Sequence, residues 1–371
     1  MIASGADIEV LRDLLVGRPI DPPLTIDTFD AVWNLAIDHR VDLLLAAALR
    51  ASGQPLPSQA RTRIETHWDD ANMRDLLRHR ELCRLVETFD RHGVPMLLLK
   101  GAGLAYLVYP ETARRPSMDV ELWIRRTDLD TAEAALVDCG YRRLREPDTE
   151  VASTQRHYGR RDGLGQNHFV DLHWRVSNPA VFADVLDFND AWDRALSIDA
   201  LGPTARTVDH ADALLLACVH RVAHHHDAEV LLWLWDIHLL VGRLDQDSVG
   251  RLADAAHRHR VSAVVARSLA RAQDRFGTVL PDGLRAALAT PQAPEPSAYF
   301  LHGLSPAAEF RSTFAATSGW PARVRLVREH LLPSRAYMRA TYSSWPSWLL
   351  PAAYVHRVLR GAPRWCRRRM L

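Results

Sequence analysis

VPMLLLKGAGLAYLVYP at residues 94–110 and ETARRPSMDVELWI at residues 111–124 are the stretches that decide the fold class. Residues 94–100 form a short apolar run between two glycines, which is typical of a buried strand. The residues up to Pro110 are typical of a short helix closed by proline. Residues 119–124 alternate between polar and apolar side chains, which predicts a second strand.

The same alternation of strand and helix continues downstream. We expect a helix over residues 127–140, with Thr127 as its N-cap and Gly140 as its stop, and another strand over residues 168–176. Strand, helix, strand, helix and strand within about eighty residues indicate a small α/β unit.

The segments on both sides of this unit have helical periodicity. Apolar residues recur at three- and four-residue steps, as at Leu82 and Leu85. We therefore predict a helix-dominated α+β fold with a small mixed sheet. Its three regions would be an N-terminal helical region at 1–92, the α/β core at 93–207, and a C-terminal helical region with a basic tail at 208–371. The N-terminal region carries no recognisable chemistry, and we assign it to packing.

Composition excludes several classes of protein. The 371 residues include 46 basic and 45 acidic ones, a net charge of +1, so no overall basic field indicates a nucleic-acid partner. No apolar run reaches the roughly 18 residues of a membrane span. The N-terminus has acids where a signal peptide needs basic and apolar residues, and the four cysteines form no CxxC pair. These features predict a cytoplasmic protein.

Three acidic residues form the candidate metal and catalytic site. Asp119 and Glu121 lie two apart on a predicted strand, so their side chains point to the same face. Neighbouring carboxylates repel each other unless a cation lies between them, and Mg²⁺ prefers oxygen ligands. Asp171, on another predicted strand, could add a ligand or act as a base. A solvated strand face is the alternative interpretation of the Asp-x-Glu pattern alone.

Residues next to these acids are suited to phosphate. Lys100, the only lysine among the 46 basic residues, begins the sequence Lys100-Gly101-Ala102-Gly103, where backbone N–H groups could approach a phosphate. Arg114 and Arg115 precede the acidic strand and could neutralise phosphate charge. Two alternatives remain: Lys100 extends to solvent, and the arginines pair with surface acids.

Several motif fragments occur in a fixed order along the chain. They are Leu99-Lys100-Gly101, Tyr109-Pro110, Arg115-Pro116, Asp119-x-Glu121, Asp171-Leu172-His173-Trp174, then His220, His224, Trp233, Asp236-Ile237 and LLPSRAYMRATY at 331–342. This combination, over residues 75 to 360, resembles the uncharacterised nucleotidyltransferase family of bacteria, within the polymerase-β-like nucleotidyltransferase superfamily. Two residues depart from the pattern: Ala102 offers no hydroxyl where the superfamily usually has serine, and Glu121 replaces the usual aspartate.

The resemblance implies transfer of a nucleoside monophosphate from an NTP to an acceptor hydroxyl or phosphate, with release of pyrophosphate. It implies that Asp119, Glu121 and Asp171 hold Mg²⁺ or Mn²⁺, and that Asp171 helps to deprotonate the acceptor. Lys100 and Arg115, with the backbone of Gly101 and Gly103, would bind phosphate. Related proteins are often associated with peptide or other natural-product biosynthesis, so a small molecule or peptide is the expected acceptor.

Histidines near the predicted site carry a second set of expectations. His173 shares the strand face of Asp171 and should line the pocket. His220 and His224 should face the cleft and contact substrate, whereas His225, His226 and His238 should be exposed. A zinc site at His220 and His224 is the alternative, although no carboxylate partner stands at motif spacing.

Two other activities and a surface contact remain open. A catalytically weak member of the fold would bind nucleotide or a partner without transfer, and a phosphotransferase would leave ADP instead of pyrophosphate. The arginine-rich C-terminus also allows peripheral contact with anionic lipid or nucleic acid, although a solvated end is the favoured interpretation.

Overall fold

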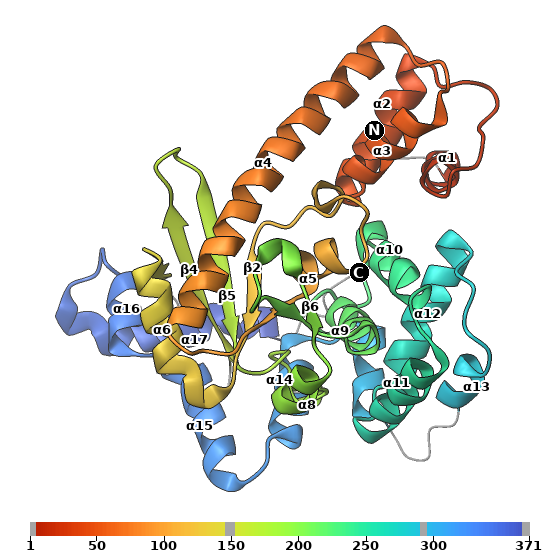
Figure 1. Cartoon of the computed structure of the whole chain (residues 1–371). Helices are drawn as coiled ribbons and strands as arrows, with labels where there is room; N and C mark the ends of the chain where they lie inside the picture. The colour runs from red at the N-terminus through yellow and green to blue at the C-terminus, as the bar shows by residue number, and fades with distance from the viewer. Residues whose placement is uncertain (1–4, 145–152, 290–294, 366–371) are drawn as a thin grey trace.

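The computed structural model describes residues 5–144, 153–289 and 295–365. It confirms a helix-dominated α+β fold with one mixed sheet of seven strands among these residues (Figure 1). The strands are β1 (Leu97–Leu99), β2 (Val120–Trp123), β3 (Arg142–Arg143), β4 (Gln155–Arg161), β5 (Asn167–His173), β6 (Leu196–Ser197) and β7 (Arg206–Thr207). Their spatial order is β3-β4-β5-β2-β1-β7-β6.

The centre of the sheet matches the prediction. Strand β2 is antiparallel to β1 and parallel to β5, and the second pairing sets Glu121 directly opposite Asp171. Asp119 precedes the first residue of β2 by one position. The long hairpin of β4 and β5 was not predicted, because Gln155–Arg161 is a polar, charged stretch without an apolar alternation.

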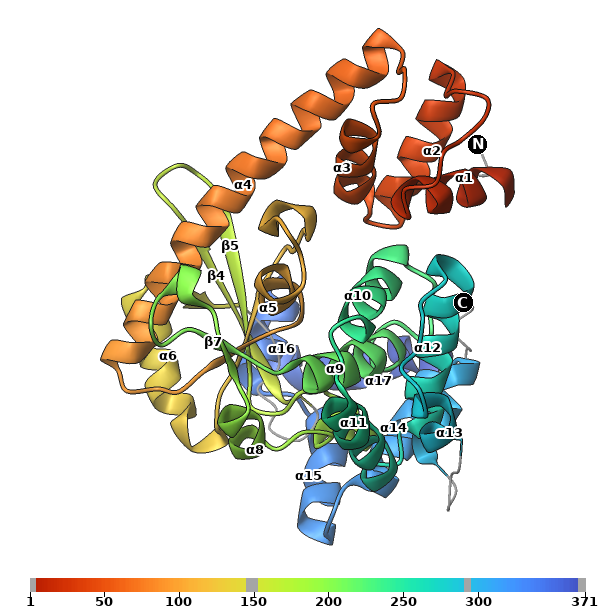
Figure 2. The same ribbon diagram turned by 45° about the vertical axis from the view of Figure 1, so that its right-hand side comes forward.

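One face of the sheet packs against two helices. The N-terminal helices are α1 (Gly5–Leu15), α2 (Ile26–Asp38), α3 (Asp42–Ser52) and α4 (Ser58–Arg91). Helix α4 runs from the α1–α3 group to the sheet, where its C-terminal half and α6 (Leu129–Asp138) share an apolar core with the strands (Figure 2). The predicted N-cap at Thr127 is wrong. A 3-10 turn, η2 (Arg126–Asp128), precedes α6, and Asp128 takes the N-cap position.

The remaining helices belong either to the α/β core or to the C-terminal region. Those nearest the site are α5 (Lys100–Leu107), which follows β1, then α9 (His210–Ala223) and α10 (Leu231–Val241). The others are α7 (Ala180–Ala183), α8 (Phe188–Asp193), α11 (Gln246–Arg258), α12 (Ser262–Phe276), α13 (Leu284–Leu288), α14 (Pro306–Ala316), α15 (Trp320–Leu331), α16 (Arg335–Thr341) and α17 (Leu350–Trp365). Short 3-10 turns are η1 (Thr112–Arg114), η3 (Asp199–Leu201), η4 (Pro296–His302) and η5 (Ser347–Leu349).

The larger apolar core joins segments far apart in the sequence. It contains Trp33 of α2, Leu99 of β1 and Leu234 of α10, all of them buried. The backbone N–H of Leu232 also donates to the carbonyl of His39 at 3.2 Å, so α10 contacts the turn after α2. The N-terminal helices are therefore fixed against the C-terminal helices. None of the described helices is long and apolar enough to cross a membrane.

Candidate active site

A cavity of about 960 Å³ lies where the sheet, the N-terminal helices and the C-terminal helices meet. The acids Asp119, Glu121 and Asp171 line it from the sheet, and Asp236 lines it from α10. Residues from α2 to α4 form a further wall: Ile37, Arg40, Asp42, Leu43, Ala71, Arg74, Asp75, Leu77, Arg78 and Glu81. The N-terminal helices thus contribute to the site, and their assignment to packing alone is wrong.

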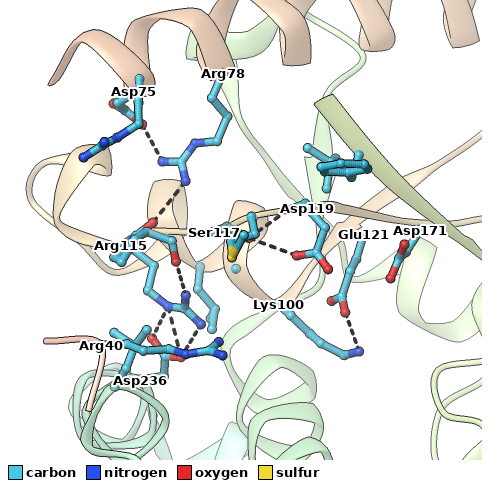
Figure 3. A pocket seen from close by; sticks show the side chains of 18 of the residues that line it. Arg40, Asp75, Arg78, Lys100, Arg115, Ser117, Asp119, Glu121, Asp171 and Asp236 are labelled. Atoms are coloured by element: carbon cyan, nitrogen blue, oxygen red, sulfur yellow. Dashed lines mark hydrogen bonds and ion pairs between the residues drawn. The ribbon is translucent and has the colours of Figure 1, made fainter. Parts of the chain in front are cut away.

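The strand register brings two of the predicted acids together with a histidine. One ligand atom each from Glu121, Asp171 and His173 lie within 4.8 Å of one another. Figure 3 shows the carboxylates of Asp119, Glu121 and Asp171 in the same part of the cavity, but Asp119 is not a member of that close group. His173 is 1% exposed and lies behind the cavity wall, so it does not line the pocket as predicted.

The side chains of this group have unused hydrogen-bonding capacity. Oε2 of Glu121 and both ring nitrogens of His173 are buried without a hydrogen-bond partner among the described residues. Such atoms are costly to bury unless something binds them. Carboxylate oxygens and a neutral imidazole nitrogen are ligands of divalent cations, and Mn²⁺ accepts both kinds. The residues therefore fit a divalent metal.

Burial controls the protonation of these groups. It raises the pKa of Asp119, with the charge of Asp171 as the next cause, and it raises the pKa of Glu121 against the opposing effect of Lys100. Burial contributes more to these two raised pKa values than the mutual repulsion of the acids does. Burial, followed by the charge of Lys100, lowers the pKa of His173, which keeps the imidazole neutral and able to bind metal.

Lys100 pairs with an acid of the site. It is the first residue of α5, with a left-handed φ of 46°, and its Nζ donates to Oε1 of Glu121 at 2.8 Å. Its side chain is only 11% exposed, so the alternative in which Lys100 extends to solvent is wrong. Contact between Lys100 and a phosphate stays a prediction.

The two glycines after Lys100 have different surroundings. Gly101 lines the cavity, and a Cβ there would lie 2.6 Å from Oγ of Ser117, which donates to the backbone oxygen of Asp119. Gly103 faces β1 instead, where a Cβ would lie 2.8 Å from the carbonyl oxygen of Leu98. Gly101 lines the cavity and so remains a candidate for phosphate binding, whereas Gly103 packs α5 against β1.

Arg115 forms a buried ion pair with a residue from the C-terminal helices. Its Nε and Nη2 donate to Oδ1 and Oδ2 of Asp236, both at 2.8 Å, and Nη1 donates to the carbonyl of Pro116. Tyr109 also donates to Oδ1 of Asp236, at 2.6 Å. Three separate motif fragments thus meet in one network. Phosphate binding by Arg115 stays a prediction, but its guanidinium already holds the loop before β2 against α10.

His220, on α9, and His224, directly after it, lie at the cavity as predicted. Burial lowers the pKa of both, that of His224 to about 3. His225 also lines the cavity and stacks on Trp233 with ring centroids 3.9 Å apart. The predicted exposure of His225, His226 and His238 is wrong, because each is partly buried. In the described chain, His220 and His224 belong to no three-residue metal-binding group, which disfavours the zinc alternative.

Two contacts to the site were missed at the sequence level. Nδ1 of His157, on β4, lies 2.5 Å from Oδ1 of Asp171, and the antiparallel pairing of β4 with β5 could not be inferred from the polar sequence of β4. Arg78 of α4 donates from Nη1 to the carbonyl of Arg115 at 3.1 Å and from Nη2 to that of Thr112 at 3.0 Å. Helix α4 contains several other arginines, and nothing in its sequence pattern distinguishes Arg78 from them.

Comparison with known proteins gives the same assignment as the motifs. The sequence profile described as "uncharacterised nucleotidyltransferase" matches residues 27–277. No match was found among curated proteins. The match begins earlier than the resemblance inferred from motifs and excludes residues 278–360. It includes the sheet, α9, α10 and every candidate site residue, and it spans well over half of the sequence. The chain therefore belongs to the uncharacterised nucleotidyltransferase family.

Proposed function

We propose that this protein transfers a nucleoside monophosphate from an NTP to a small-molecule or peptide acceptor, with Mg²⁺ or Mn²⁺, in natural-product biosynthesis. Family membership supports the nucleotidyltransferase activity. The observation that carries the proposal is the register of β2 and β5, which sets Glu121 opposite Asp171 on the wall of a large cavity with Oε2 of Glu121 unpartnered.

In this reaction a bond forms between the acceptor oxygen and the α-phosphorus, and the bond from that phosphorus to the β-phosphate oxygen breaks. Pyrophosphate leaves, and Asp171 takes the proton of the acceptor hydroxyl. Glu121, Asp171 and His173, with Asp119 nearby, would hold the cation. A bound divalent cation stabilises charge on the attacking and leaving oxygens of such a displacement. Lys100, at the N-terminus of α5, would bind phosphate once it leaves Glu121.

The size of the cavity supports a small acceptor. Small-molecule sites commonly have volumes of roughly 300–1,000 Å³, and this cavity of about 960 Å³ is at the upper end. Such a volume suits a nucleotide together with a modest acceptor group. His225 and Trp233, stacked at the wall, offer an aromatic surface for one of the two.

A catalytically weak, nucleotide-binding protein is the second candidate. Two observations favour it: Lys100 already occupies Oε1 of Glu121, and Ala102 has no hydroxyl to contact phosphate. A metal could displace Lys100 from Glu121, because both positive charges compete for the same carboxylate. The first of these observations would then no longer favour a catalytically weak protein.

Product analysis separates these functions. Each NTP is incubated with Mn²⁺ or Mg²⁺ and a pool of candidate acceptors, and pyrophosphate, NDP and acceptor mass are measured. We expect pyrophosphate and an acceptor heavier by a nucleoside monophosphate, lost in Asp171→Asn but retained in the matched variant Asp90→Asn, at an exposed residue of α4. NDP would indicate a phosphotransferase, and nucleotide binding without any product would support the second candidate.

A further inference from the structure

The charge of this chain is strongly divided along its length. Residues 311–371 contain twelve arginines and one acid, Glu329, a net charge of +11. Residues 1–310 contain 34 basic and 44 acidic residues, a net charge of −10. The overall charge of +1 therefore conceals a basic C-terminal segment, and the family match ends before it, at residue 277. Such asymmetry is typical of a segment that contacts a polyanion or an anionic surface.

Helix α15 in this segment leaves an apolar row uncovered. Trp320, Val324 and Leu331 are 70%, 61% and 44% exposed. They stand at positions i, i+4 and i+11, so they lie on one helical face. An arginine, Arg328, is exposed on the same helix. Soluble proteins rarely expose such rows without a partner.

A second row with the same spacing runs through η5 and α17. Trp348, Val355 and Leu359 are 75%, 58% and 67% exposed, at positions i, i+7 and i+11, and Ala352 at i+4 is also exposed. Arg360 is exposed beside Leu359. Each row thus begins with a tryptophan, continues with aliphatic residues and has arginine next to it.

We propose that these two rows form a docking surface for an anionic lipid bilayer. We define the C-terminal surface as Trp320, Val324, Leu331, Trp348, Val355 and Leu359. Amphipathic helices with tryptophan and aliphatic residues on one face and arginines beside them lie in the membrane interface, with the apolar face among the acyl chains and the cations at the headgroups. The net charge of +11 complements an anionic leaflet.

The apolar rows favour a bilayer over nucleic acid. A nucleic-acid surface would use the same arginines but would gain little from exposed valine and leucine, because its contacts are mainly with phosphate. No described helix can cross the membrane, so the contact would be peripheral. The C-terminal surface is separate from the cavity residues, and its function does not depend on nucleotide transfer.

Vesicle binding by the full chain tests this proposal. The protein is sedimented with vesicles of phosphatidylcholine alone or with about 40% phosphatidylglycerol, and hydrogen exchange is measured on the wild type. We expect binding to the anionic vesicles at least about tenfold tighter than to the neutral ones, weakened by about 0.5 M NaCl, with new protection in residues 320–331 and 348–360.

Matched variants separate apolar insertion from simple charge attraction. Val355→Ser with Leu359→Ser, which leaves the charge unchanged, should weaken binding about tenfold or more, whereas Val137→Ser, at an exposed apolar residue of α6, should not. Arg328→Glu with Arg360→Glu should also weaken binding, unlike Arg61→Glu on α4. The proposal is overturned if no vesicle binds, if neutral vesicles bind equally well, or if the new protection lies elsewhere. It is also overturned if the variant at Val355 and Leu359 binds vesicles as tightly as the wild type and added RNA displaces the vesicles completely, because contact with phosphate alone would then explain the binding.

Discussion

Arg115, in the loop before β2, and Asp236, on α10, are joined by two parallel hydrogen bonds of 2.8 Å, although 121 residues separate them. The side chains of the pair are 8% and 3% exposed. Desolvating both charges is costly, and the two-point geometry with the additional bond from Tyr109 offsets that cost. This pair ties the acidic strand to the C-terminal helices and so fixes the width of the cavity between them.

Breaking this pair from one side should be strongly destabilising. Arg115→Ala or Asp236→Ala leaves a buried charge unpaired, and we expect a loss of about 3–5 kcal/mol in the free energy of unfolding. The double variant Arg115→Met with Asp236→Leu should lose less free energy of unfolding than either alanine variant, because it leaves no buried charge unpaired. Urea unfolding measures these values. Arg114→Ala, in a half-exposed pair with Glu111, is the control and should cost under about 1 kcal/mol. A loss of NTP affinity at unchanged stability would instead assign Arg115 to phosphate.

We predict that a ring nitrogen of His173 binds the metal directly. With Mn²⁺ bound, pulsed electron paramagnetic resonance should detect a directly coordinated imidazole nitrogen, and His173→Ala should abolish that signal. We expect the affinity for Mn²⁺ to fall roughly tenfold or more, and that for Mg²⁺ to fall less, because Mg²⁺ prefers oxygen. His220→Ala, at a histidine that lines the cavity, should retain the signal. A nitrogen signal that persists in His173→Ala would remove His173 from the metal site.

The sequence was informative where the pattern was local. Strands β1, β2 and β5 were predictable because apolar runs and alternation reflect burial of each strand by itself, and the same-face rule placed Asp119 with Glu121 and Asp171 with His173. Strand β4 was not predictable, because its place in the sheet comes from pairing with β5 rather than from its own polar residues.

The cavity walls depended on contacts that no local pattern contains. Arg78 reaches the loop at Arg115, 37 residues later, and the stack of His225 on Trp233 depends on how α10 returns along α9. Family motifs were a better guide there. Tyr109, Arg115 and Asp236 occur in separate fragments that one buried network explains.

The protonation of Asp119 gives a pH dependence with a definite sign. Its pKa is raised above 3.8 in the native protein, mainly by burial, so the stability it contributes is present at low pH and is lost as pH rises through the native pKa. Without metal, Asp119→Asn should therefore gain stability relative to the wild type as pH increases above about 4. The gain should be about 1.4 kcal/mol for each unit by which the pKa is raised.

Thermal unfolding in a chelator between about pH 4 and 8 tests this sign. Addition of Mn²⁺ and NTP should make the wild type more stable than Asp119→Asn, because these ligands stabilise only the form with an ionised site. Asp90→Asn is the control, since the exposed side chain of Asp90 lies outside the cavity. If Asp119→Asn is less stable than the wild type at every pH, with and without metal, Asp119 has a purely structural function.

The last prediction concerns Lys100. Its removal should strengthen the binding of a metal at Glu121 but weaken the binding of a nucleotide phosphate. Nζ of Lys100 holds Oε1 of Glu121, so a metal must compete with an ammonium for that carboxylate. Lys100→Met keeps the length of the side chain but removes the charge. We expect Mn²⁺ alone to bind several-fold tighter, while affinity for NTP falls about tenfold because a phosphate contact is lost. Calorimetric titration should be done near pH 8, since Lys100 lowers the pKa of Glu121 and its loss would favour protonation. Arg40→Met, at another cationic residue of the cavity, is the control and should leave the affinity for Mn²⁺ unchanged. If the affinity for Mn²⁺ falls in Lys100→Met, the lysine orders Glu121 for the metal, and an unchanged affinity for NTP would show that it does not bind the nucleotide.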